Sequence, residues 1–187
     1  MTDALLIVDP QLDFCPGGAL PVAAGDRIFA PLNRIQPRFE TVVASRDWHP
    51  ADHVSFRGRG GQWPDHCVRD SPGAQFHSDL DTSRIQHVVN KGTDPDAEAY
   101  SAFDGTGLAE WLRGADVTRL FVAGLATDYC VLRSVIDAIR AGFEVFVISD
   151  CIAAVDLHAG DGERAIAEMK AAGAKLVTES EVSALKA

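Results

Sequence analysis

Residues 119–149 read RLFVAGLATDYCVLRSVIDAIRAGFEVFVIS and contain a complete strand–helix–strand pattern. The runs Arg119–Ala123 and Glu144–Ser149 are apolar on both faces, which is typical of strands buried between two layers of helices. Between them, Tyr129–Ala141 has helical periodicity, and Gly142 stands at the usual C-cap position. A strand, a helix and a second strand in this order predict two parallel strands joined by a right-handed crossover.

The same alternation extends over the rest of the chain. Four further strands are predicted, at Ala4–Val8, Thr41–Ser45, His87–Asn90 and Lys175–Thr178. Three further helices are predicted, at about Asp26–Arg38, Gly107–Arg113 and Asp161–Ala172. The pattern predicts a three-layer αβα fold of the α/β class with a mostly parallel, six-stranded, Rossmann-like sheet. Residues 1–187 are expected to form a single domain.

Composition and charge limit the classes of function. The 187 residues include 17 basic and 27 acidic ones, a formal net charge of -10. Such a charge repels phosphate backbones and anionic lipids, so neither nucleic acid nor a membrane is expected as a partner. The four cysteines form no CxxC pair, which argues against a zinc ribbon or a disulfide scaffold. The apolar run Ala4–Val8 is too short for a signal peptide or a membrane span, so a cytoplasmic location is expected.

Three reactive side chains follow predicted strands, at the sheet edge where open parallel sheets bind ligands. Asp9 follows the first strand, Lys91 follows the third, and Cys130 opens the helix after the fourth. A thiol at a helix N-terminus is expected to have a lowered pKa, and N–H groups there can stabilise an oxyanion. Together the residues fit a nucleophile, a base and an ammonium that keeps the base charged. The alternatives are a buried cysteine that only packs, a capping aspartate and a simple Lys–Asp ion pair.

A second polar group lies in the segment Asp47–Ser83, which has no predicted helix or strand. Asp47, His49 and His53 lie within seven residues, and His66 follows in WPDHC. A carboxylate with imidazoles suits a divalent ion such as zinc, manganese or iron. The spacing is not that of a zinc finger or a zincin, so histidines that are only solvated or hydrogen-bonded are the alternative. A loop this long inside a compact domain is usually functional.

These motifs resemble those of a known family. IVDPQLDFC (residues 7–15), NKG (90–92) and GLATDYC (124–130) are similar to the Asp–Lys–Cys triad of the isochorismatase-like cysteine hydrolases. RDWHP (46–50) and WPDHC (63–67) are similar to the metal site of one branch, the nicotinamidases, also called pyrazinamidases. The match runs from about residue 4 to residue 178, with its motifs in order.

The resemblance implies that the chain hydrolyses nicotinamide, and also pyrazinamide, to the acid and ammonia through a cysteine thioester, in NAD salvage. Cys130 would be the nucleophile, Asp9 the general base that later protonates the ammonia, and Lys91 the partner of Asp9. The backbone N–H groups of Ala126 and Cys130 would form the oxyanion hole. The peptide bond Leu125–Ala126 would be cis.

The resemblance also implies a metal site and a pocket. One divalent ion, zinc, iron or manganese, would be held by Asp47, His49 and His66, with His53 as a fourth histidine that some members have. The ion would bind the pyridine nitrogen of the substrate. The flat ring would lie among Phe14, Leu20, Trp63, Tyr100 and Tyr129. Relatives occur as monomers and as larger assemblies, so a homo-oligomer is compatible with the resemblance.

Two other functions stay open on the sequence alone. The chain could be a related cysteine hydrolase that acts on another small amide, a carbamoyl compound or a vinyl ether. It could also be a non-catalytic member that binds a small ligand or a metal on the same scaffold. The metal motifs argue against the first function, and the presence of Asp9, Lys91 and Cys130 together argues against the second.

Overall fold

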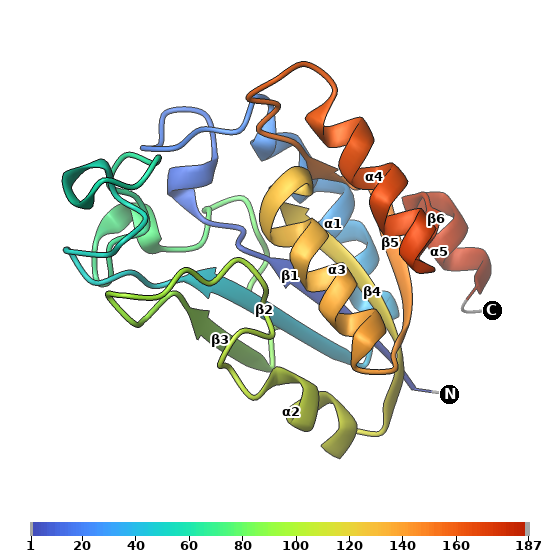
Figure 1. Cartoon of the computed structure of the whole chain (residues 1–187). Coiled ribbons are helices and arrows are strands. Elements are labelled where there is room, and N and C mark those ends of the chain that lie inside the picture. The colour runs from blue at the N-terminus through green and yellow to red at the C-terminus, as the bar shows by residue number, and fades with distance from the viewer. Residues whose placement is uncertain (1, 186–187) are drawn as a thin grey trace.

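Six apolar segments form one sheet in the computed structural model, which describes residues 2–185 (Figure 1). The strands are β1 (Thr2–Val8), β2 (Thr41–Asp47), β3 (His87–Lys91), β4 (Val117–Leu125), β5 (Glu144–Ala153) and β6 (Lys175–Val177). Their order is β3-β2-β1-β4-β5-β6, and every neighbouring pair is parallel. The predicted α/β fold with a six-stranded parallel sheet is confirmed.

The connections between the strands carry the helices. These are α1 (Phe29–Ile35), α2 (Leu108–Gly114), α3 (Leu132–Arg140), α4 (Asp161–Ala172) and α5 (Glu179–Leu185). The predicted helix Asp26–Arg38 is shorter than expected, because 3-10 turns occupy both of its ends and Pro37 has no N–H to continue the α-helical ladder. Helix α5 is an addition to the predicted elements. No helix within residues 2–185 is long and apolar enough to cross a lipid bilayer.

The central strand β1 separates two hydrophobic clusters. Leu5 and Ile7 pack in the cluster that includes side chains of α1 and α5. Leu6 and Val8 point to the other face and pack with side chains of α2, α3 and α4. Because helices cover both faces of the sheet, both faces of this strand must be apolar.

The strands β1, β2 and β3 end at one edge of the sheet, and this edge positions the site. Asp9 follows β1, and the register of β2 and β3 places Asp47 directly beside Lys91. A Cβ added at Gly124 would lie 2.0 Å from the Val8 carbonyl oxygen, so β4 can pass the end of β1 only with glycine there. Figure 1 shows the segment 47–83, without a long helix or strand, gathered beyond the arrowheads of β2 and β3.

Candidate active site

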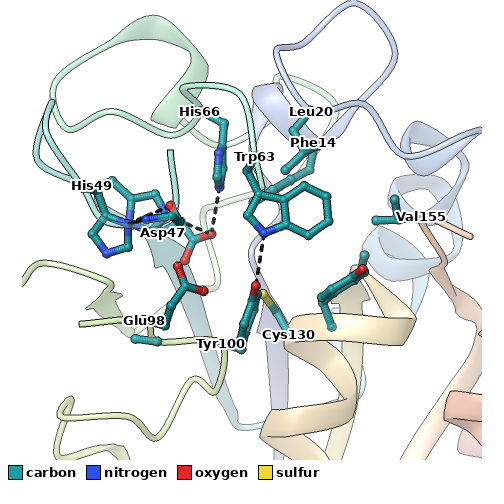
Figure 2. Close-up of a pocket in the computed structure, with 15 residues that line it drawn as sticks. Phe14, Leu20, Asp47, His49, Trp63, His66, Glu98, Tyr100, Cys130 and Val155 are labelled. Atoms are coloured by element: carbon teal, nitrogen blue, oxygen red, sulfur yellow. Dashed lines mark hydrogen bonds and ion pairs between the residues drawn. The ribbon is translucent and has the colours of Figure 1, made fainter. Parts of the chain in front are cut away.

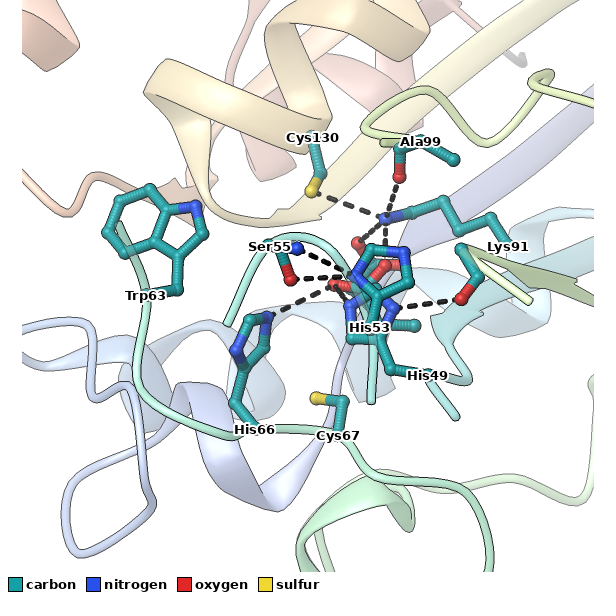
Figure 3. A network of polar contacts seen from close by, with 12 residues as sticks. His49, His53, Ser55, Trp63, His66, Cys67, Lys91, Ala99 and Cys130 are labelled. Atoms are coloured by element: carbon teal, nitrogen blue, oxygen red, sulfur yellow. Dashed lines mark hydrogen bonds and ion pairs between the residues drawn. The ribbon is translucent and has the colours of Figure 1, made fainter. Parts of the chain in front are cut away.

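Lys91 stands at the centre of a buried polar cluster (Figure 3). Its Nζ lies 2.9 Å from Asp9 Oδ2 and 3.4 Å from Cys130 Sγ. It also forms a short ion pair with Asp47 Oδ1 and donates to the Ala99 carbonyl at 3.3 Å. The structure therefore brings the three predicted catalytic side chains together and adds Asp47 to them.

The Asp9 carboxylate is held in place from the neighbouring strand. Asp9 has a left-handed φ of 46°, and its backbone N–H donates to the Ser45 carbonyl at 3.2 Å. The Ser45 hydroxyl donates to Asp9 Oδ1 at 2.7 Å. The carboxylate and the Cys130 sulfur offer atoms within 4.8 Å of one another. Asp9 and Cys130 thus belong to one buried cluster. Ser45 is not among the site residues predicted from the sequence. Its only sequence signal is that it is a polar residue near the end of an apolar strand.

Burial and mutual charge determine the protonation of this cluster. Burial raises the pKa of Asp9, and Asp47 adds to this while Lys91 opposes it. Burial alone would lower the pKa of Lys91, but the two carboxylates raise it well above its usual value. Burial also raises the pKa of Cys130 well above its usual value, although Lys91 opposes the shift. This direction is opposite to the lowered thiol pKa expected from a helix N-terminus, and loss of solvation is its largest cause.

Cys130 lies in a turn that differs from the predicted helix start. Residues Thr127–Val131 form a single π-helical turn between β4 and α3, and the N–H groups of Tyr129 and Val131 both donate to the Ala126 carbonyl at 3.1 Å. The peptide bond Leu125–Ala126 is cis, as the resemblance implies. An oxyanion hole made by the N–H groups of Ala126 and Cys130 stays a prediction.

Asp47, His49 and His66 form a second buried cluster, in which one ligand atom of each lies within 4.8 Å of the others. Asp47 Oδ2 is 3.4 Å from His49 Nε2 and 3.9 Å from His66 Nε2. The Nδ1 atoms of the two rings lie 2.9 Å and 2.8 Å from the carbonyl oxygens of Gly92 and Pro64. Because a carbonyl only accepts, Nδ1 carries the proton in each neutral ring, and Nε2 turns its lone pair toward the carboxylate. This donor set fits a divalent cation.

His53 lies beside this cluster with both ring nitrogens already hydrogen-bonded. Its Nδ1 is 2.7 Å from Ser55 Oγ, and its Nε2 is 3.0 Å from the Ala97 carbonyl. The ring stacks on His49, with 4.1 Å between the ring centroids. The structure therefore does not bring His53 into the ligand set that the sequence motifs predicted. The spacing of the histidines could not reveal this, because Ala97 belongs to a distant segment.

Asp47 links the two clusters, since its two carboxylate oxygens face different partners. Oδ1 contacts Lys91, and Oδ2 faces the two histidines. Burial would raise the pKa of Asp47, but Lys91 and His49 lower it below its usual value. The buried Gln11 side chain accepts from the Asp47 N–H and donates to the Asp47 carbonyl, both at 2.8 Å. Gln11 was also absent from the predicted site, and only its place after the first strand marks it.

A pocket opens beside both clusters (Figure 2). Its walls include the predicted ring-binding side chains Phe14, Leu20, Trp63, Tyr100 and Tyr129. They also include Ser55, Glu98 and Val155, which no sequence signal singled out. Trp63 Nε1 donates to Tyr100 Oη at 3.1 Å, and the Tyr129 ring packs edge-on against Trp63 at 5.0 Å. A largely apolar pocket lined by aromatic side chains, with a few polar groups, suits one small aromatic molecule.

Comparisons with known proteins cover nearly the whole chain. A model of the isochorismatase domain matches residues 3–181. The nicotinamidase of Escherichia coli strain K12 is 44% identical over an alignment of 200 residues, which covers 94% of each protein. The crystal structure of the pyrazinamidase of Pyrococcus horikoshii in complex with zinc is similar, with 47% identity, a TM-score of 0.88, and coverage of 95% of this chain and 99% of that one. PnC1 from L. infantum in complex with nicotinate has 42% identity, a TM-score of 0.91, and coverage of 96% and 93%.

Proposed function

The chain belongs to the isochorismatase family, and we propose that it hydrolyses nicotinamide to nicotinate and ammonia, with pyrazinamide as a second substrate. The observation that carries this proposal is that Cys130 and the Asp47–His49–His66 group line one pocket, together with aromatic side chains. The similar nicotinamidase of E. coli favours this substrate over another small amide. We also expect residues 1–187 to act as one domain, in the cytoplasm and without nucleic acid, in keeping with the net charge of -10.

In the first half of the reaction, Cys130 Sγ attacks the carboxamide carbon while the thiol proton moves to Asp9. The oxygen of the tetrahedral intermediate accepts hydrogen bonds from the N–H groups of Ala126 and Cys130. Asp9 then gives its proton to the departing nitrogen, so that ammonia leaves and a thioester forms. Lys91, at 2.9 Å, keeps the Asp9 carboxylate charged and ready to take the next proton.

In the second half, Asp9 removes a proton from the water that attacks the thioester carbon. The carbon–sulfur bond breaks, and the proton held on Asp9 returns to the sulfur of Cys130. The ring acid leaves and releases its carboxyl proton to solvent, which gives the carboxylate. One residue thus acts as base and then as acid in each half, which needs a carboxylate that is fixed and shielded from bulk water, as Asp9 is.

We assign Asp47, His49 and His66 as ligands of one divalent ion. The zinc-bound relative and the donor set both support a divalent metal, and zinc, iron and manganese all suit these ligands. When bound, such an ion supplies a Lewis-acid site for the pyridine nitrogen of the substrate. The hydrogen bonds to Gly92 and Pro64 orient the two imidazoles for this purpose.

The test is ammonia release from nicotinamide by purified protein of known metal content, next to Cys130→Ala and His49→Ala. We expect the wild type to turn over, the first variant to be inactive with its metal retained, and the second to lose both metal and activity. Cys151→Ala is the matched control, because Cys151 is a buried free cysteine that does not line the pocket. If metal-loaded wild type releases no ammonia from nicotinamide or pyrazinamide, the proposed function is wrong.

A further inference from the structure

Asp128 lies two residues before Cys130 and holds a different part of the chain. It is half-buried on the π-helical turn Thr127–Val131. Its Oδ1 accepts the backbone N–H of Val155, and its Oδ2 accepts that of Asp156, both at 2.9 Å. The carboxylate therefore uses both oxygens to join the turn of the nucleophile to the loop 154–160, which connects β5 to α4.

Val155, which receives the first of these bonds, is part of the pocket wall. Its half-buried side chain packs against the hydrophobic cluster that contains Leu125 and Ala126. Figure 2 shows Val155 on the side of the pocket away from His49. The distance between this wall and the nucleophile turn thus depends on the backbone position of Val155.

The far end of the loop is anchored separately. Asp156 has a left-handed φ of 51°, and its Oδ1 accepts the N–H of Gly162 at the start of α4 at 2.8 Å. A Cβ added at Gly162 would lie 2.6 Å from the Cβ of Ala154, so the loop packs closely on the helix there. The two carboxylates hold the loop between the nucleophile turn and α4.

We propose that Asp128 is a positioning residue that sets the width of the ring pocket by holding the backbone of Val155 against the nucleophile turn. The proposal deepens the proposed function and rests on it. The Asp128 carboxylate accepts hydrogen bonds from backbone groups of the pocket wall. Its loss is therefore expected to weaken binding of the substrate ring. The chemical step depends on Cys130, Asp9 and Lys91, whereas the two hydrogen bonds of Asp128 go to Val155 and Asp156.

The first test compares Asp128→Asn with wild type. The asparagine amide offers one acceptor oxygen and turns an NH₂ group toward the other N–H, so one of the two bonds is lost. We expect KM for nicotinamide to rise about tenfold and kcat to stay within about twofold, since a hydrogen bond to a charged group contributes on this scale. Discrimination against a ring-methylated nicotinamide should weaken as the wall moves. Asp137→Asn, at a half-buried residue of α3 that pairs with Arg140, is the matched control and should change neither constant.

A double-mutant cycle distinguishes an effect of Asp128 on the pocket wall at Val155 from an effect on the turn that carries Cys130. Val155→Ala removes the wall side chain and should itself raise KM. If Asp128 acts through Val155, adding Asp128→Asn to this variant should raise KM by less than about twofold more. Full additivity of the two changes, or a loss of kcat with KM unchanged, would show that Asp128 acts on the Cys130 turn and would overturn the proposal.

Hydrogen exchange tests the same contact without any variant or substrate. The amides of Val155 and Asp156 should exchange more slowly than that of Leu157, which is 53% exposed in the same loop. Equal exchange rates in wild type refute the proposal even if Asp128→Asn fails to fold. If wild type releases no ammonia, the proposed function fails; if it does and the kinetic or exchange results differ from these, only the role of Asp128 fails.

Discussion

Replacing Lys91 by methionine should destabilise the protein strongly, because it leaves buried carboxylates without their cation. The side chains of Lys91 and Asp9 are both 0% exposed, and their charged atoms lie 2.9 Å apart. Methionine fills much the same volume and brings no charge. With the proposed ion bound, Asp47 would keep a cationic partner, so Asp9 is the carboxylate that loses its own.

The size of the effect follows from this burial. Removing one partner of a buried ion pair costs about 3–5 kcal/mol, a large part of the roughly 5–15 kcal/mol by which a domain is stable. The matched control is Lys175→Met, which removes an ammonium paired with Glu144, where the two side chains are 60% and 40% exposed. Exposed pairs of this kind contribute about 0–1 kcal/mol. The two lysine variants should therefore differ by several kcal/mol.

The destabilisation should shrink as the pH falls. Burial already raises the pKa of Asp9 above its ordinary 3.8, and loss of Lys91 raises it further. A group whose pKa is raised in the folded state binds its proton more tightly there than in the unfolded chain. Its contribution to stability is full below the unfolded pKa and is lost as the pH rises through the folded pKa. Lys91→Met should therefore regain stability relative to wild type when the pH drops through the folded pKa of Asp9.

Urea titrations followed by tryptophan fluorescence measure these free energies for wild type, Lys91→Met and Lys175→Met. They are run at neutral pH and at a series of lower pH values, because Asp9 in the variant takes up its proton as the pH falls. The reasoning is refuted if Lys91→Met costs no more than Lys175→Met, or if the gap between Lys91→Met and wild type widens at the lower pH.

Three further predictions concern chemistry and metal binding. Cys130→Ala should lower kcat by at least about a thousandfold and leave the urea midpoint nearly unchanged; residual turnover above this level would remove Cys130 as nucleophile. His66→Ala should lose its metal on gel filtration. His53→Ala should keep one equivalent, since both ring nitrogens of His53 have other partners. Metal loss from His53→Ala would show that His53 is a ligand after all. Gln11→Met should weaken metal affinity about 10–100-fold, because the backbone of Asp47 loses two hydrogen bonds. Competition with a chromogenic chelator measures this affinity, and an unchanged value would contradict the prediction.

The sequence by itself determined the sheet and the edge that carries the site. Strands between two helix layers must be apolar on both faces, and this pattern is local, so runs such as Ala4–Val8 could be found without a structure. The carboxyl ends of parallel strands meet at one edge, so Asp9 and Lys91 could be placed near each other before the strand order was known. The predicted helix Asp26–Arg38 is longer than the observed α1, because Gln36–Arg38 forms a 3-10 turn in which Pro37 supplies no N–H.

Only the tertiary structure decided which atoms meet at that edge. The division of the Asp47 oxygens between Lys91 and the histidines depends on the register of β2 and β3, which residue spacing does not encode. His53 and His66 are equally good candidate ligands in the sequence. In the structure, Nε2 of His53 contacts the carbonyl of the distant Ala97, whereas Nδ1 of His66 contacts the carbonyl of the neighbouring Pro64. The pKa of Cys130 is raised, whereas its place at the start of a predicted helix indicated a lowered value. The cause is desolvation, which depends on every group packed around the thiol and so cannot be inferred from the local sequence.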